Sequence, residues 1–162
     1  MRLKGQNSQF FAAFFAAALM MSIGDPCLAG PFEPLAGSWA GNGTLTMSGT
    51  RERIRCRAVY FVLAGGESLK QVLRCASDNF IIDVHSDVVE IDGRLSGSWQ
   101  ETSSGVSGSL SGIVRGGAIR GFISGLGVTA SLSLITRGRS QYASINLSGG
   151  TTAVVVVNFH RM

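Results

Sequence analysis

Histidine, cysteine and charged residues are all scarce in this chain of 162 residues, and each shortage argues against a class of function. Its two histidines, His85 and His160, lie in no nucleophile motif, so nothing indicates a hydrolase. Its three cysteines show no Cys-x-x-Cys spacing, and no His-x-x-x-His pair indicates a metal site. A net charge of +4 is too small to indicate a nucleic-acid partner. We therefore expect a protein that is not an enzyme and that carries neither a metal nor a cofactor.

Long hydrophobic runs are also missing, except for one near the start of the chain. Arg2 and Lys4 precede an apolar run of about 15 residues, FFAAFFAAALMMSIG, whereas a membrane-spanning helix needs roughly 20. This layout predicts a secretory signal peptide over residues 1–29, cleaved after Ala29, and a single domain over residues 30–162. We expect the mature chain in the periplasm or outside the cell, without a transmembrane span.

Cleavage of that signal peptide would remove Cys27 and leave Cys56 and Cys75 as a pair. In an oxidising compartment, two thiols in a small domain form a disulfide far more often than a metal site. An uncleaved anchor and lipidation of Cys27 are the less favoured alternatives, because Gly-Asp-Pro before this cysteine lacks the Leu-x-small pattern of a lipoprotein. The mature chain would keep a charge of +3, with twelve basic and nine acidic residues.

Turn signals recur roughly every ten residues after Gly37, and no stretch has the periodicity of an amphipathic helix. The clearest are Gly65-Gly66, Asp92-Gly93 and Gly116-Gly117. They predict about ten strands, over residues 37–48, 51–63, 68–76, 79–91, 94–102, 105–115, 118–125, 128–136, 140–147 and 152–160. The predicted fold is all-β: a single antiparallel up-and-down meander that closes into a barrel of about 8–10 strands, because closure removes exposed edges. An open two-layer sandwich is the alternative.

The predicted turns also fix which side chains face inward. A two-residue turn at Gly65-Gly66 places Cys56 directly opposite Cys75, where a disulfide can form. A turn at Ser77-Asp78 would pair Cys75 with Phe80. Because side chains alternate between the two faces of a strand, the mostly apolar Cys56 face becomes the inside. The candidate ligand-binding residues of this interior are the aromatic side chains Trp39, Tyr60, Phe80 and Trp99. Several glycines share the inner face, and they either leave room for a ligand or let the strands bend around a packed centre.

A stripe of arginines is the most unusual charge feature of the sequence. Because they alternate along one strand, Arg51, Arg53, Arg55 and Arg57 project outward from one face, and the register places Arg74 opposite Arg57. They form a candidate anion-binding surface for an envelope component such as lipid headgroups or lipopolysaccharide. The alternative is an ordinary solvated strand surface, partly neutralised by neighbours such as Asp83.

A second charged row, Asp83, His85 and Asp87, alternates outward on the fourth predicted strand. Metal ligands must converge on one point, whereas three side chains in a row on a flat strand do not. We therefore expect a charge ladder with Lys70 and Arg74, and no metal site.

The opening of the first strand, Leu35-Ala36-Gly37-Ser38-Trp39-Ala40-Gly41, resembles the Gly-x-Trp signature of the calycin barrels, which include lipocalins, avidins and fatty-acid-binding proteins. About ten strands is most similar to fatty-acid-binding and nitrobindin-like barrels. Nitrobindin-like proteins hold haem through a histidine near the chain end, but His160 is expected to point outward here. The spacing of LAGSWAGNG, ERIRCRAVY, LRCAS and LSGSWQE is also similar to a family of exported alphaproteobacterial proteins, a resemblance that implies export and no particular activity.

Two functional hypotheses follow from these observations. The first is a non-enzymatic exported barrel that binds a small, largely apolar molecule in its interior. The second is a structural or interaction module of the cell envelope that uses its basic outer strand face.

Overall fold

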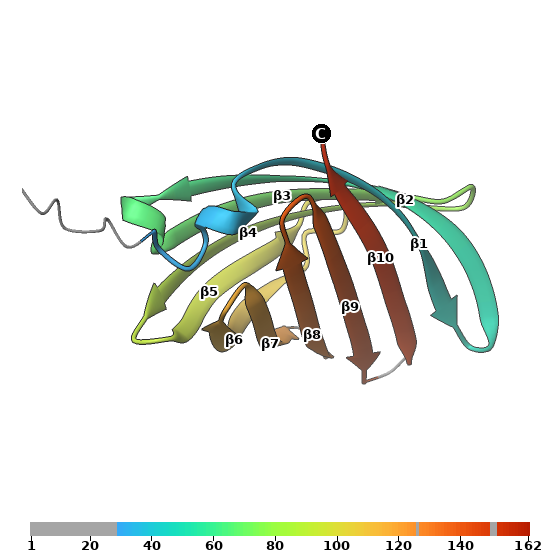
Figure 1. Cartoon of the computed structure of the whole chain (residues 1–162). Coiled ribbons are helices and arrows are strands. Elements are labelled where there is room, and N and C mark those ends of the chain that lie inside the picture. Colours follow the sequence, from blue (N-terminus) through green and yellow to red (C-terminus); the bar gives the residue numbers. More distant parts are fainter. Residues whose placement is uncertain (1–28, 126, 150–151) are drawn as a thin grey trace, which may run out of the picture.

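Ten antiparallel strands form the molecule, and each is hydrogen-bonded to the next (Figure 1). The computed structural model describes residues 29–125, 127–149 and 152–162. The strands are β1 (Gly37–Met47), β2 (Thr50–Leu63), β3 (Ser68–Ala76), β4 (Ile81–Ile91), β5 (Arg94–Glu101), β6 (Ser107–Arg115), β7 (Ala118–Gly125), β8 (Val128–Arg137), β9 (Ser140–Ser148) and β10 (Ala153–Arg161). Two 3-10 turns, η1 (Glu33–Leu35) and η2 (Ala64–Gly66), complete the described elements.

The barrel is closed by the pairing of the first strand with the last. Trp39 on β1 is paired with Ala58 on β2 and with Arg161 on β10. The order around the barrel is β1-β10-β9-β8-β7-β6-β5-β4-β3-β2, so every strand has a neighbour on both sides. This arrangement confirms the predicted closed meander and excludes the sandwich alternative.

Tight turns with positive φ angles join several of the strands. Asp92 (φ 53) and Gly93 (φ 77) connect β4 to β5, and Gly116 and Gly117, both also at positive φ, connect β6 to β7. Two consecutive residues at positive φ give the turn whose twist matches that of paired strands. The turn signals read from the sequence are therefore confirmed at these two sites.

The register between β2 and β3 is the one predicted. Cys56 is paired with Cys75, and a disulfide joins them, with Cα atoms 4.1 Å apart. The register between β3 and β4 differs from the prediction, because Cys75 is paired with Ile82 instead of Phe80. The connection is a four-residue loop closed by the hydrogen bond from the Ser77 N–H to the Phe80 carbonyl, 2.9 Å long. A shift of two residues keeps the same side chains inside, so the predicted faces of β4 hold.

Side chains alternate between a buried inner face and an exposed outer face on each strand, as predicted. On β2, for example, Ile54, Cys56 and Ala58 are buried, and the arginines between them are exposed. One core runs through the barrel and includes Trp39, Tyr60, Leu69, Val88, Leu95, Leu110, Val114, Ile119, Leu134, Val157 and Phe159.

The predicted signal peptide lies almost entirely outside the described residues, and so does Cys27. Within the part of the chain that the structure describes, no helix has the length and apolar character to cross a membrane.

Candidate functional site

The two ends of the barrel differ, and we name the end that contains η1 and η2 the sealed end (Figure 1, left). The segment before β1 folds across this end, held by a 3.1 Å hydrogen bond from the Phe32 N–H to the Gly66 carbonyl. Phe32 and Trp39 are both 0% exposed. The Trp39 indole N–H donates to the Leu35 carbonyl at 2.8 Å, and the Arg161 guanidinium lies 4.6 Å from the centre of the Trp39 ring. Packing and a cation–π contact therefore close this end.

A buried polar chain lies inside the sealed end. The Tyr60 hydroxyl donates to Oε1 of Gln141 at 3.0 Å, and Nε2 of Gln141 donates to the Thr136 hydroxyl at 3.1 Å. All three residues are buried, and burial raises the pKa of Tyr60 well above its ordinary value of 10.0. The hydrogen bonds compensate for the removal of these groups from water. Sequence reasoning placed Tyr60 inside but missed Thr136 and Gln141, because apolar residues marked the inner face and these two side chains are polar.

The opposite end of the barrel, where the β1–β2 hairpin and the loops at residues 77–80 and 102–106 lie, is named the open end. Apolar side chains that face the interior here are only partly buried: Leu45, Leu73, Phe80, Val84, Trp99, Ile123, Leu132 and Val155. The Trp99 indole N–H donates to the Ser124 carbonyl at 3.3 Å, two strands away. Its cross-strand partner on β6 is Gly108, where an added Cβ would lie 1.9 Å from the Ser124 carbonyl oxygen. The inner surface at this end is thus largely apolar and reached by solvent, with the half-buried Glu52 beside Leu45 as a charged residue on it.

The rim of the open end is held by hydrogen bonds within the loop after β5. The carboxylate of Glu101 accepts hydrogen bonds from the Ser103 N–H at 3.1 Å and from the Ser104 N–H at 2.7 Å. Hydrogen bonds from Ser103 and Ser104 lower the pKa of Glu101 to about 2. The carboxylate is therefore ionised at neutral pH and keeps this loop folded beside Trp99.

The four aromatic residues predicted to line a ligand site do not lie together. Trp39 and Tyr60 belong to the packed sealed end, whereas Phe80 and Trp99 lie at the open end. Only Phe80 and Trp99 are therefore placed to contact a molecule entering the interior.

The inner-face glycines are explained by close approach of neighbouring strands. A Cβ added to Gly43 would lie 2.0 Å from the Val156 carbonyl oxygen, and one added to Gly97 would lie 2.1 Å from that of Asp87. Real Cβ atoms do not approach an oxygen so closely, so these positions require glycine for the backbone to bend into the barrel. Of the two explanations offered by the sequence, strand bending applies at these positions.

The arginine stripe lies on the outside of the barrel. We name the exposed residues Arg51, Arg53, Arg55 and Arg57 of β2, with Arg74 of β3, the basic face. Arg57 is directly opposite Arg74, as predicted. Arg74 forms an ion pair with Asp83, with 3.7 Å between its Nη1 and Oδ2 of the carboxylate. Among the described residues, the four arginines of β2 have no carboxylate within 4.0 Å, so the expected neutralisation reaches only Arg74.

The charged row on β4 forms the predicted ladder. Nζ of Lys70 lies 2.9 Å from Oδ1 of Asp87, and Nε2 of His85 lies 3.4 Å from Oδ1 of Asp83. Residues 29–125, 127–149 and 152–162 contain no cluster of three His, Cys, Asp or Glu side chains arranged to hold a metal ion. His160 is exposed on the outer face of β10, so it does not reach the interior where a haem would lie in a nitrobindin-like barrel.

Comparison with known proteins gives fold relatives only. No protein-family model and no curated protein matches the chain. The structure is similar to that of the S-type phycobiliprotein lyase CPES from Guillardia theta, with a TM-score of 0.62 and 12% sequence identity over 81% of this chain and 90% of that one. It is also similar to Rv2717c from M. tuberculosis, with a TM-score of 0.60 and 17% identity over 80% of this chain and 94% of that one. At these identities the likenesses show a shared barrel fold, which is consistent with the calycin-like architecture that the Gly-x-Trp opening predicts.

Proposed function

We propose that this protein is an exported, non-enzymatic barrel that binds a small, largely apolar molecule through the open end of its interior. The observation that carries the proposal is the contrast between the two ends. Trp39 and Phe32 are wholly buried at the sealed end, whereas Phe80 and Trp99 are part of a solvent-reached apolar surface at the open end. An apolar concave surface with few polar groups is typical of small-molecule sites.

The placement of the histidines supports a binding role over catalysis. Both histidines of the chain, His85 and His160, are exposed on the outer surface and lie away from the interior. A general base must lie within hydrogen-bond reach of the proton that it removes. Neither imidazole can serve a molecule held inside the barrel. One fold relative is named as a lyase, but a fold shared at 12% identity carries no activity with it.

Native mass spectrometry can test the proposal. The full-length gene, with its own leader, is expressed, and the mature protein is purified from the exported fraction without organic solvent. We expect a population carrying one small molecule per chain, lost under denaturing conditions. The stripped protein should regain one molecule when mixed with a solvent extract of the same cells. A chain that neither carries nor takes up any such molecule would contradict the proposal.

A further inference from the structure

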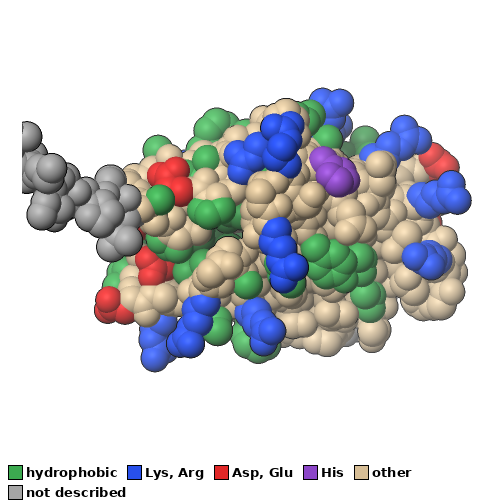
Figure 2. Space-filling view, in the orientation of Figure 1, with side chains coloured by type: hydrophobic (Ala, Val, Ile, Leu, Met, Phe, Trp, Pro, Cys, Tyr) green, Lys and Arg blue, Asp and Glu red, His purple; other side chains and the backbone are tan. Residues whose placement is uncertain are grey.

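The basic face holds four arginines whose charge is not neutralised by neighbouring side chains. Successive outward residues on a strand are about 7 Å apart, so the stripe from Arg51 to Arg57 runs for roughly 20 Å. Arg57 lies directly opposite Arg74, and like charges in this position are unfavourable for a strand pair. Basic side chains are spread over the surface in Figure 2, and several of them lie at the end formed by the β1–β2 hairpin, with an acidic side chain beside them. The face therefore presents a concentrated positive charge at the open end.

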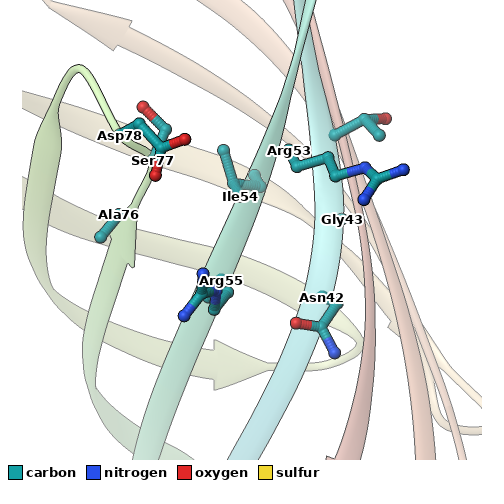
Figure 3. Close-up of a pocket in the computed structure, with 9 residues that line it drawn as sticks. Asn42, Gly43, Arg53, Ile54, Arg55, Ala76, Ser77 and Asp78 are labelled. Atoms are coloured by element: carbon teal, nitrogen blue, oxygen red, sulfur yellow. The ribbon is translucent and has the colours of Figure 1, made fainter.

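Two hollows follow this stripe on the outer surface. One, of about 410 Å³, is lined by Arg55, Arg57, Arg74 and His160 around the small side chains of Ala40 and Ala76. The other, of about 760 Å³, is lined by Asn42, Thr44, Arg53, Arg55, Ser77 and Asp78. Figure 3 shows Arg55 and Asn42 on neighbouring strands, with Ser77 and Asp78 on the loop that faces β2. The hollows combine cationic groups with amide and hydroxyl donors, which is the donor set that recognises phosphate oxygens.

The carboxylates near the stripe do not cancel its charge. Glu52 turns to the inner face of β2, where its Oε1 accepts a 2.9 Å hydrogen bond from the side-chain amide of Asn79. Asp78 lines the larger hollow and forms no ion pair with a described arginine. The four arginines of β2 therefore outnumber the two nearby carboxylates, Glu52 and Asp78, and the surface retains a net positive charge.

A large apolar side chain is exposed next to the basic face. Ile81, at the start of β4, is 54% exposed on the outer face, whereas Met47, at the tip of the β1–β2 hairpin, is 46% exposed on the face of β1 that also carries Leu45. Ile81 is paired with Ala76, which is paired in turn with Arg55. A soluble polyanion has no apolar part that could contact an exposed apolar side chain, whereas a lipid surface offers both phosphates and hydrocarbon.

We propose that the basic face docks on an anionic lipid bilayer, with the arginines against headgroup phosphates and with Ile81 in the apolar boundary beside them. This orientation lays the outer side of β2 and β3 against the bilayer. The docking is independent of whether the interior holds a ligand, and it goes beyond the proposed function.

Cosedimentation with lipid vesicles tests the docking on the mature, disulfide-bonded protein. We expect binding to vesicles containing one quarter phosphatidylglycerol and little binding to pure phosphatidylcholine. Binding should weaken steeply between about 20 mM and about 150 mM salt, because screening shortens the reach of exposed charges. The Arg53→Gln/Arg55→Gln variant should bind about 25-fold more weakly, at about a factor of five for each basic residue near an anionic surface.

A matched variant separates this face from total charge. Arg94 on β5 and Arg120 on β7 are exposed on the other side of the barrel, so Arg94→Gln/Arg120→Gln makes the same change of charge away from the stripe. It should bind vesicles within about twofold of the unmodified chain, and both variants should keep its melting temperature. Equal losses in the two variants would show attraction by net charge alone and would overturn the proposal.

A third arm distinguishes a bilayer from a soluble source of phosphate. Ile81→Ser should weaken vesicle binding and leave binding of inorganic polyphosphate unchanged. Binding of polyphosphate in the absence of vesicle binding would overturn the proposal, since the face would then serve a soluble polyanion. Failure of docking would leave the interior site untouched, because binding of a neutral apolar probe does not involve the arginines.

Discussion

The Tyr60 hydroxyl on β2 donates a 3.0 Å hydrogen bond to Gln141 on β9, a residue 81 positions further along the chain. The bond crosses the interior of the sealed end and ties an early strand to a late one. Gln141 is bonded in turn to Thr136 on β8. This buried chain can form only when the barrel is closed, so it reports on closure as well as on stability.

Tyr60→Phe should lower the free energy of unfolding by about 1–3 kcal/mol, because Oε1 of Gln141 is left buried without a donor. Urea denaturation of the mature protein measures this difference. Tyr142→Phe is the matched control: Tyr142 is 40% exposed on the outer face of β9, and its hydroxyl can remain in water. Equal effects of the two changes would show that the buried chain contributes no stability.

The same tyrosine predicts a loss of stability at alkaline pH. Burial raises the pKa of Tyr60 above its ordinary value of 10.0, so above that pH the unfolded chain releases a proton that the folded chain retains. The free energy of unfolding is therefore complete below about pH 10 and falls as the pH rises further. In the Tyr142→Phe variant, phenolate absorbance near 295 nm should appear only as the far-ultraviolet circular dichroism is lost. Absorbance that rises while the fold is intact would contradict the buried position of Tyr60.

Reduction of the Cys56–Cys75 disulfide should lower the free energy of unfolding by about 3 kcal/mol on the loop-entropy model, since the closed loop contains about 20 residues. The measured loss should be smaller than this value, because the bridge joins neighbouring strands of one hairpin that are already close together. Intact mass of the purified protein before and after alkylation tests the bridge. Two alkylated thiols without prior reduction would contradict it.

The inner glycines predict a graded response to added methyl groups. Gly112 on β6 is paired with Gly121 on β7, but an added Cβ would lie 2.2 Å from the Arg120 carbonyl oxygen at the first and 3.1 Å from that of Ser111 at the second. Gly112→Ala should therefore cost about 1–3 kcal/mol, as overpacking does, and Gly121→Ala should cost less. Thermal denaturation of the two variants is the measurement. The opposite ranking would contradict strand bending as the reason for glycine.

Much of the barrel could be predicted from the sequence because its constraints are local. Two-residue periodicity sets the face of each side chain, and glycine turns set the register, as the pairing of Cys56 with Cys75 confirms. The loop at residues 77–80 shows the limit of this reasoning. Ser77-Asp78 reads as a two-residue turn, but hydrogen bonds from the N–H groups of Asn79 and Phe80 to the Ser77 hydroxyl support a four-residue loop, which moved Phe80 out of its predicted pair.

The candidate site was less predictable because it depends on distant residues. Trp39, Tyr60, Phe80 and Trp99 share one face in the sequence pattern, and nothing local shows that two of them lie in a sealed end. That division depends on Phe32, whose segment precedes the first strand and carries no periodicity. The arginine stripe was visible from spacing alone, whereas the smaller hollow beside it requires Ala40 on β1 and Ala76 on β3 to lie on the two sides of β2.

Binding of the neutral fluorescent probe N-phenyl-1-naphthylamine, compared between two aromatic variants, tests the interior site most directly. Trp99→Ala removes an aromatic ring from the open end, and Phe122→Ala removes one that is 70% exposed on the outer surface of β7. We expect saturable binding of one probe per chain, weakened about tenfold or more by Trp99→Ala, as loss of a buried aromatic contact implies, and unchanged by Phe122→Ala. Binding that is not saturable, or that is lost in Phe122→Ala and kept in Trp99→Ala, would place the apolar site on the outside of the barrel and contradict an interior site.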